Sequence, residues 1–181
     1  DGSTIVFTES SNAGTATLTI DDSSFINFSQ SGNSTYHGTI VPNGMTQSGL
    51  ISKLGSGIVE FLGTNTGFKG STVISNGNFK VNSQTPYDGL VSVTNKGILS
   101  GTGIFGTVFV SDGGMISPGN SPGTLTVTNY IPSSTAIFGP IIEGTQAGLL
   151  HITGPTVTTL NGSVVVSIPQ NQFSLYYPYL V

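Results

Sequence analysis

Arginine, tryptophan and cysteine are absent from this chain of 181 residues, and charged side chains of either sign are scarce. Asp, Glu, Lys and Arg together make up 7% of the sequence, whereas an average soluble protein carries about 25%. The only strong cations are four lysines, and the formal net charge is -4. Because binding of nucleic acid depends on clusters of Lys and Arg, we expect no nucleic-acid partner.

The missing cysteines exclude disulfides and thiolate chemistry. They suit a chain that crosses a membrane unfolded, because a premature disulfide would close a loop too bulky for a narrow pore. No apolar run approaches the roughly 18 residues of a membrane-spanning helix. The chain starts at Asp1 with neither a methionine nor a signal peptide, so we expect it to be one segment, 1–181, of a longer exported protein.

Small and hydroxylated residues dominate what is present. Gly, Ser, Thr and Asn account for 87 of the 181 residues, yet hydrophobic residues still make up 36%. That apolar content, combined with low charge, argues against disorder. Good helix formers are scarce while Thr, Val, Ile and Gly are abundant, so the composition predicts an all-β chain with many turns.

Short alternating runs indicate where the strands lie. Apolar residues recur at every second position over three to six residues, which predicts short strands with one face inward. Tight turns are expected at Asn-Gly and Asp-Gly pairs, at 43–44, 76–77, 88–89, 112–113 and 161–162. The residues predicted to face inward are Leu18, Val59, Phe61, Val73, Val81, Val93, Val108, Val110, Leu125, Val127, Val164 and Val166.

An internal repeat distinguishes between the possible all-β architectures. The spacing of the runs fits a sandwich as well as a solenoid, but residues 31–38 align with 63–70 at an offset of 32. Imperfect repeats of short strands with glycine turns are typical of a β-solenoid, whose rungs stack at about 4.8 Å. With roughly 20 residues to a rung, we expect eight or nine rungs.

The segment Lys53–Asn82, which begins Lys-Leu-Gly-Ser-Gly, resembles the passenger-associated repeat of bacterial autotransporters. Leu99–Gly106 and Gly113–Val127 resemble the part of the passenger that follows this repeat. Within the latter, the string Ser-Pro-Gly-Asn-Ser-Pro-Gly-Thr-Leu at 117–125 is the most specific motif. The resemblance extends loosely over residues 10–168.

The resemblance implies a right-handed parallel β-helix that is secreted or displayed on the surface of a Gram-negative bacterium. It implies a non-catalytic role as adhesin or structural stalk, and a C-terminal membrane β-barrel outside this chain. The expected partner is a host-cell or bacterial surface protein or glycan, and the resemblance does not identify it. The expected folding nucleus is 100–181, because the end nearest the barrel emerges first.

Candidate catalytic groups are few and scattered. His37 and His151 lie far apart in the sequence, and we expect each at a turn or an exposed rung position. Adjacent carboxylates such as Asp21 and Asp22 point to opposite faces of a strand and suit a turn. The remaining carboxylates considered, at positions 60, 112 and 143, are expected to face solvent or a turn. The sequence therefore predicts no catalytic, metal or cofactor site.

The alternative is an exported β-helical enzyme acting on carbohydrate, either a polysaccharide lyase or a glycoside hydrolase. A lyase needs a cation beside the abstracted proton and acidic Ca²⁺ ligands, and this chain has no arginine. Another surface β-solenoid is a further alternative. The last nine residues hold Phe173, Tyr176, Tyr177 and Tyr179, which we expect to pack on the final rungs or to cover an exposed sheet edge.

Overall fold

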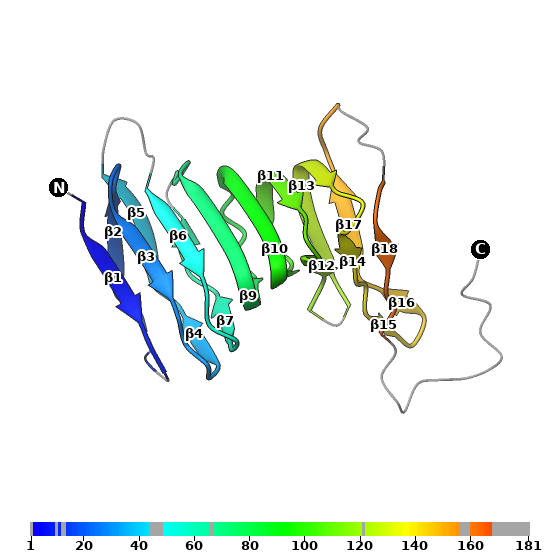
Figure 1. Ribbon diagram of the computed structural model, residues 1–181, viewed down its shortest axis with the longest axis horizontal. Helices are drawn as coiled ribbons and strands as arrows, with labels where there is room; N and C mark the ends of the chain where they lie inside the picture. The colour runs from blue at the N-terminus through cyan, green and yellow to red at the C-terminus, as the bar shows by residue number, and fades with distance from the viewer. Residues whose placement is uncertain are drawn as a thin grey trace.

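The computed structural model is a parallel β-solenoid of about seven turns. It describes residues 2–9, 11, 14–43, 49–65, 67–120, 122–155 and 160–167. No helix occurs in these ranges, and so none could span a membrane. Figure 1 shows the strands lying side by side from β1 at one end to β18 at the other, along the long axis. The predicted all-β solenoid is confirmed.

Three stacks of parallel strands, here called faces A, B and C, surround a common interior. Face A contains β1 (Thr4–Phe7), β3 (Phe25–Phe28), β6 (Leu50–Lys53) and parts of β9 (Ser71–Val81), β10 (Tyr87–Gly101), β11 (Ile104–Val110) and β13 (Thr124–Pro132). Face B contains β4 (Ser34–Tyr36), β7 (Ile58–Phe61), the ends of β9 and β10, β12 (Met115–Pro118), β14 (Ile137–Phe138) and β18 (Ser163–Val164). Face C contains β2 (Thr17–Asp21), β5 (Thr39–Asn43), β8 (Thr64–Asn65), the starts of β10, β11 and β13, and β17 (Leu149–Ile152).

One hairpin interrupts this pattern. Strands β15 (Ile142–Glu143) and β16 (Gln146–Ala147) pair antiparallel beside the last turns. The chain makes about seven turns instead of the eight or nine expected. The hairpin takes up residues that add no turn, and the other turns vary in length.

The turns differ in length. Val91 pairs with Val108, 17 residues on, whereas Phe25 pairs with Leu50, 25 residues on. The offset of 32 between residues 31–38 and 63–70 is therefore not one turn. The two segments share an aromatic residue followed two positions later by glycine. A Cβ on Gly38 would lie 2.7 Å from the ring of Tyr36, and a Cβ on Gly70 would lie 2.5 Å from the ring of Phe68. The repeat marks this local packing unit, which occurs at different corners of the coil.

Two strands are longer than the sequence predicts. β9 has 11 residues and β10 has 15, because each continues around a corner between faces A and B. Gly77 makes the corner in β9 with a φ of 64°, and Asn95 makes it in β10 with a φ of 53°. The Asn-Gly pair at 76–77 thus bends a continuous strand instead of reversing the chain. The pair at 112–113 does form a turn, with positive φ at both residues.

Nine of the twelve residues predicted to face inward are buried. The prediction is wrong for Val73, whose neighbours Thr72 and Ile74 occupy the interior, so that Val73 faces outward. It is also wrong for Val164 and Val166, which are 67% and 46% exposed. Val164 belongs to the final strand of face B in the described part of the chain, so no described rung covers it.

Aromatic rings connect the turns through the interior. Phe7 stacks on Phe28 with ring centroids 5.1 Å apart. A second series runs from Tyr36 to Phe61, Tyr87 and Phe105, with successive centroid separations of 5.3, 5.5 and 5.7 Å. Such ring pairs add roughly 0.5–1.5 kcal/mol each beyond area burial. The core is therefore continuous along the coil axis.

Glycines let the turns come into backbone contact at corners. A Cβ on Gly63 would overlap the carbonyl oxygen of Gly38 one turn earlier, and a Cβ on Gly70 would overlap that of Gly49. The same relation links Gly89 to Gly70. The abundance of glycine thus follows from close contact between rungs.

Candidate functional site

The two histidines occupy distant exposed positions. His37 lies between β4 and β5 near the start of the coil, and His151 lies in β17 near its end. Thr126 is the register partner of His151. The structure does not bring the two imidazoles together.

The carboxylates are also separated. Asp21 ends β2 and accepts a hydrogen bond from the Asn43 amide at 2.8 Å, while Asp22 lies in the following turn. Asp112 lies in a turn with a φ of 50°, and Glu143 ends the short strand β15. No group of three His, Cys, Asp or Glu able to hold a metal ion occurs in the described residues.

Glu60 belongs to a polar ladder on the outside of face B. Its carboxylate lies 3.2 Å from the Lys80 ammonium and accepts a hydrogen bond of 2.8 Å from the Asn82 amide. The Asn82 side-chain oxygen in turn accepts the Thr102 backbone N–H at 3.1 Å. Half-exposed ion pairs of this kind contribute about 0–1 kcal/mol. The ladder links three turns, which is a structural role.

Lys53 is the one lysine inside the core of the described chain. It stands between Phe28 and Ile74 in an inward row and is fully buried. Its ammonium donates to the carbonyl oxygen of Gly55 and, at 3.2 Å, to that of Asn76. Burial lowers the pKa of Lys53 to about 8.

The ammonium of Lys53 lies at the corner between faces A and B, beside Asn76 and Gly77. A Cβ on Gly77 would lie 2.7 Å from the Lys53 Nζ, so the glycine leaves room for the charge. The lysine thus donates to backbone carbonyls of two successive turns at this corner. In the sequence, Lys53 stood out only as the first residue of the segment that resembles the passenger repeat, and its burial was not predicted. The glycines at 55 and 57 that follow it are the one local feature that could have indicated a buried lysine.

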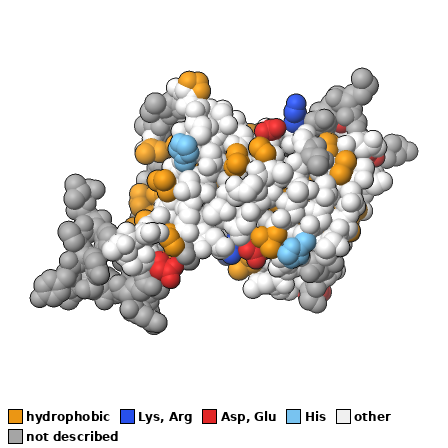
Figure 2. All heavy atoms as spheres, turned by 180° about the vertical axis from the view of Figure 1, so that it is seen from behind, with side chains coloured by type: hydrophobic (Ala, Val, Ile, Leu, Met, Phe, Trp, Pro, Cys, Tyr) orange, Lys and Arg blue, Asp and Glu red, His pale blue; other side chains and the backbone are white. Residues whose placement is uncertain are grey.

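A charge-free row runs along the outside of face A. Its seven members are consecutive register partners: Val6, Asn27, Ser52, Val73, Ser92, Phe109 and Ile131. Val6 is 51% exposed and Phe109 is 39% exposed. Figure 2 shows that the opposite side of the molecule is also covered mostly by backbone and uncharged side chains, with only scattered charge. Six of its members are exposed or half-buried, whereas Ser52 is buried.

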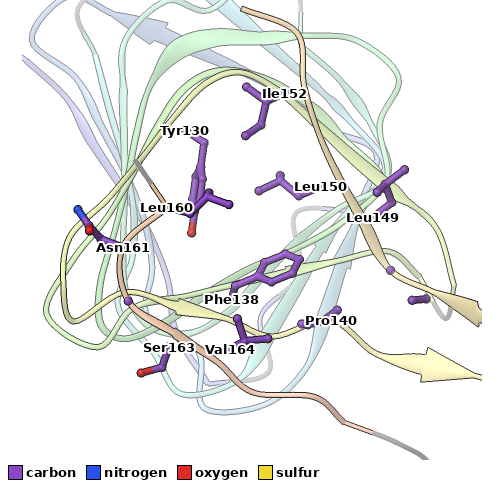
Figure 3. Close-up of a pocket in the computed structure, with 13 residues that line it drawn as sticks. Tyr130, Phe138, Pro140, Leu149, Leu150, Ile152, Leu160, Asn161, Ser163 and Val164 are labelled. Carbon is purple, nitrogen blue, oxygen red and sulfur yellow. The ribbon is translucent and has the colours of Figure 1, made fainter. Parts of the chain in front are cut away.

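A pocket of about 450 Å³ opens at the C-terminal end of the described coil. Figure 3 shows Tyr130, Phe138, Leu150, Ile152 and Leu160 pointing into the space that the last turn encloses. This pocket is the interior of the solenoid where no described rung covers it. No sequence pattern predicted this pocket, and the nearest signal is the group of apolar residues Leu149, Leu150 and Ile152.

No protein-family model, no curated protein and no solved structure matches this chain. The comparisons therefore leave the β-solenoid fold as the established property of the molecule.

Proposed function

We propose that this chain is a non-catalytic stalk segment of a bacterial autotransporter passenger, secreted or displayed at the surface of a Gram-negative cell. The observation that carries the proposal is the stack of turns from β1 to β18 with one continuous core. Each rung of such a stack contacts only the rungs next to it, so the stack holds its two ends apart. That geometry suits a spacer between a membrane anchor and a distal surface.

Three properties of the chain support export as the route to that location. The repeat resemblance of Lys53–Asn82 and the motif at 117–125 are typical of passengers. The motif lies at the corner between β12 and β13, where Gly119 has a φ of 99°. The chain has no cysteine and little charge, and each turn can fold onto a finished one, so folding can proceed stepwise outside the cell.

The outer row on face A favours a second candidate, adhesion to a host-cell or bacterial surface protein or glycan. A charge-free row with an exposed Phe109 presents apolar contacts without a desolvation cost for ions. Replacing Phe109 by Ser would weaken such binding, whereas Leu62→Ser, at a site of similar exposure outside the outer row, would not. If the chain serves only as a stalk, cells that carry either variant should adhere as well as cells that carry the unsubstituted protein.

The test of the proposal is the location of the chain in the bacterium that encodes it. Antibodies raised against the chain should label intact cells, or detect it in the growth medium, without permeabilisation. Labelling only after permeabilisation would contradict the proposal. Turnover of polygalacturonate or common glycans, with or without Ca²⁺, would instead favour the exported carbohydrate-active enzyme.

A further inference from the structure

The C-terminal end of the described coil leaves a large apolar surface uncovered. Leu149, Leu160 and Val164 at the pocket are 57%, 75% and 67% exposed. Val165 and Val166 beside them are each 46% exposed. Contiguous exposed apolar patches of this kind mark contact sites in soluble proteins.

The last described residue, Ser167, is hydrogen-bonded at the rim of this pocket. The Ser167 N–H donates to the Pro140 carbonyl at 3.2 Å, and the Ile142 N–H donates to the Ser167 carbonyl at 2.9 Å. Pro140 is one of the residues that line the pocket. Ser167 therefore lies at the edge of the opening, and residues 168–181, which include Phe173 and the three C-terminal tyrosines, lie outside the described residues.

The sequence that follows matches the pocket in chemistry. Residues 168–181 contain eight apolar or aromatic side chains and no charged one. Three tyrosines in this stretch each combine a large apolar ring with a hydroxyl, and such rings suit an opening whose lining residues are mostly apolar.

We propose that residues 168–181 fill the open end of the solenoid as an intramolecular cap, with aromatic side chains seated among Phe138, Leu150 and Leu160. The cap covers the apolar interior and protects the edges of β17 and β18 from pairing with another chain. The covalent connection at Ser167 gives the segment an effective concentration in the millimolar range, which favours this occupant over a second copy of the chain.

Tryptophan scanning of the full chain tests the cap. The chain has no tryptophan, so each of the variants Phe173→Trp, Tyr176→Trp, Tyr177→Trp and Tyr179→Trp carries a single fluorophore. In at least one variant we expect emission shifted to shorter wavelength and acrylamide quenching several-fold weaker than in urea. Adding Leu160→Asp should abolish this protection, because a charge enters the pocket at a position that is already exposed.

Leu54→Asp is the matched control, since Leu54 is 45% exposed and lies between β6 and β7, remote from the pocket. It should leave the quenching protection unchanged, and far-UV circular dichroism should show that both Asp variants remain folded. Quenching in all four Trp variants equal to that of the unfolded chain would overturn the proposal. Protection that disappears on dilution would also overturn it, because the occupant would then be a second copy.

Discussion

Replacement of Gly63 by alanine should separate two turns of the coil. A Cβ at this position would overlap the Gly38 carbonyl oxygen and lie 2.9 Å from its carbon, and both obstacles are backbone atoms. No side-chain rotation relieves such an overlap, so the two rungs must move apart. The hydrogen bonds at risk are Thr64 N–H to Gly38 O at 3.1 Å and Leu62 N–H to Tyr36 O at 2.9 Å.

The expected cost follows from these contacts. Each backbone hydrogen bond contributes about 0.5–1.5 kcal/mol net, and a buried group left without a partner costs about 1–3 kcal/mol. Loss of one or two bonds together with loosened core packing predicts a destabilisation of roughly 3–5 kcal/mol, which is exceptional for a point substitution. Gly32→Ala is the matched control, because its Cβ would have only the Glu9 carbonyl oxygen nearby, at 3.8 Å.

The assay is urea unfolding of both variants followed by far-UV circular dichroism. Gly32→Ala should remain within about 1 kcal/mol of the parent chain or stabilise it slightly by restricting the unfolded state. If the two alanine variants have the same free energy of unfolding, close backbone contact is not what glycine provides at position 63.

Three further predictions concern the core, the buried charge and the order of folding. Phe61→Ala should destabilise the chain by about 3–5 kcal/mol, since Phe61 is fully buried between two other aromatic rings; a loss below about 1 kcal/mol in a urea melt would contradict this. Because burial lowers the pKa of Lys53 from 10.5 to about 8, the unfolded chain binds more protons than the folded chain between these values, and the free energy of unfolding should rise with pH from about 8 to 10. Lys53→Met should flatten that rise and Lys69→Met, at an exposed site, should not. The fragment 100–181 should retain β-structure in circular dichroism while 1–99 does so poorly, and a sturdier N-terminal fragment would refute nucleation from the C-terminal end.

Much of the fold could be predicted from composition and alternation. Strands with a strict apolar–polar alternation, such as Thr17–Asp21, assign their own inward face. Val73 and Ile74 are adjacent and both apolar, so alternation alone cannot decide which faces inward. The register with Ser52 and Ser92 decides it, and register depends on distant segments that no local pattern specifies.

The number of residues in each turn was the other feature that the sequence could not supply. Turn length depends on how corners are built, and corners at Gly77 and Asn95 lie inside continuous strands. The burial of Lys53 was equally hidden, because a lysine is ordinarily expected at the surface. Only the carbonyl groups of Gly55 and Asn76, brought together by stacking of the turns, explain its position.

The central claim is that successive turns stack in parallel with a defined register, since the stalk, the outer row and the open end all depend on it. Thr39 pairs with Thr64 one turn later and with Thr17 one turn earlier, and the hydroxyls of Thr39 and Thr64 lie 3.0 Å apart. In this cysteine-free chain, the double variant Thr39→Cys/Thr64→Cys should form a disulfide rapidly under native conditions. Thr17→Cys/Thr64→Cys should not, because two turns span about 9–10 Å and a disulfide requires Cα atoms within about 7 Å. Equal oxidation rates for the two pairs, or faster closure of the second, would contradict the stacked parallel solenoid.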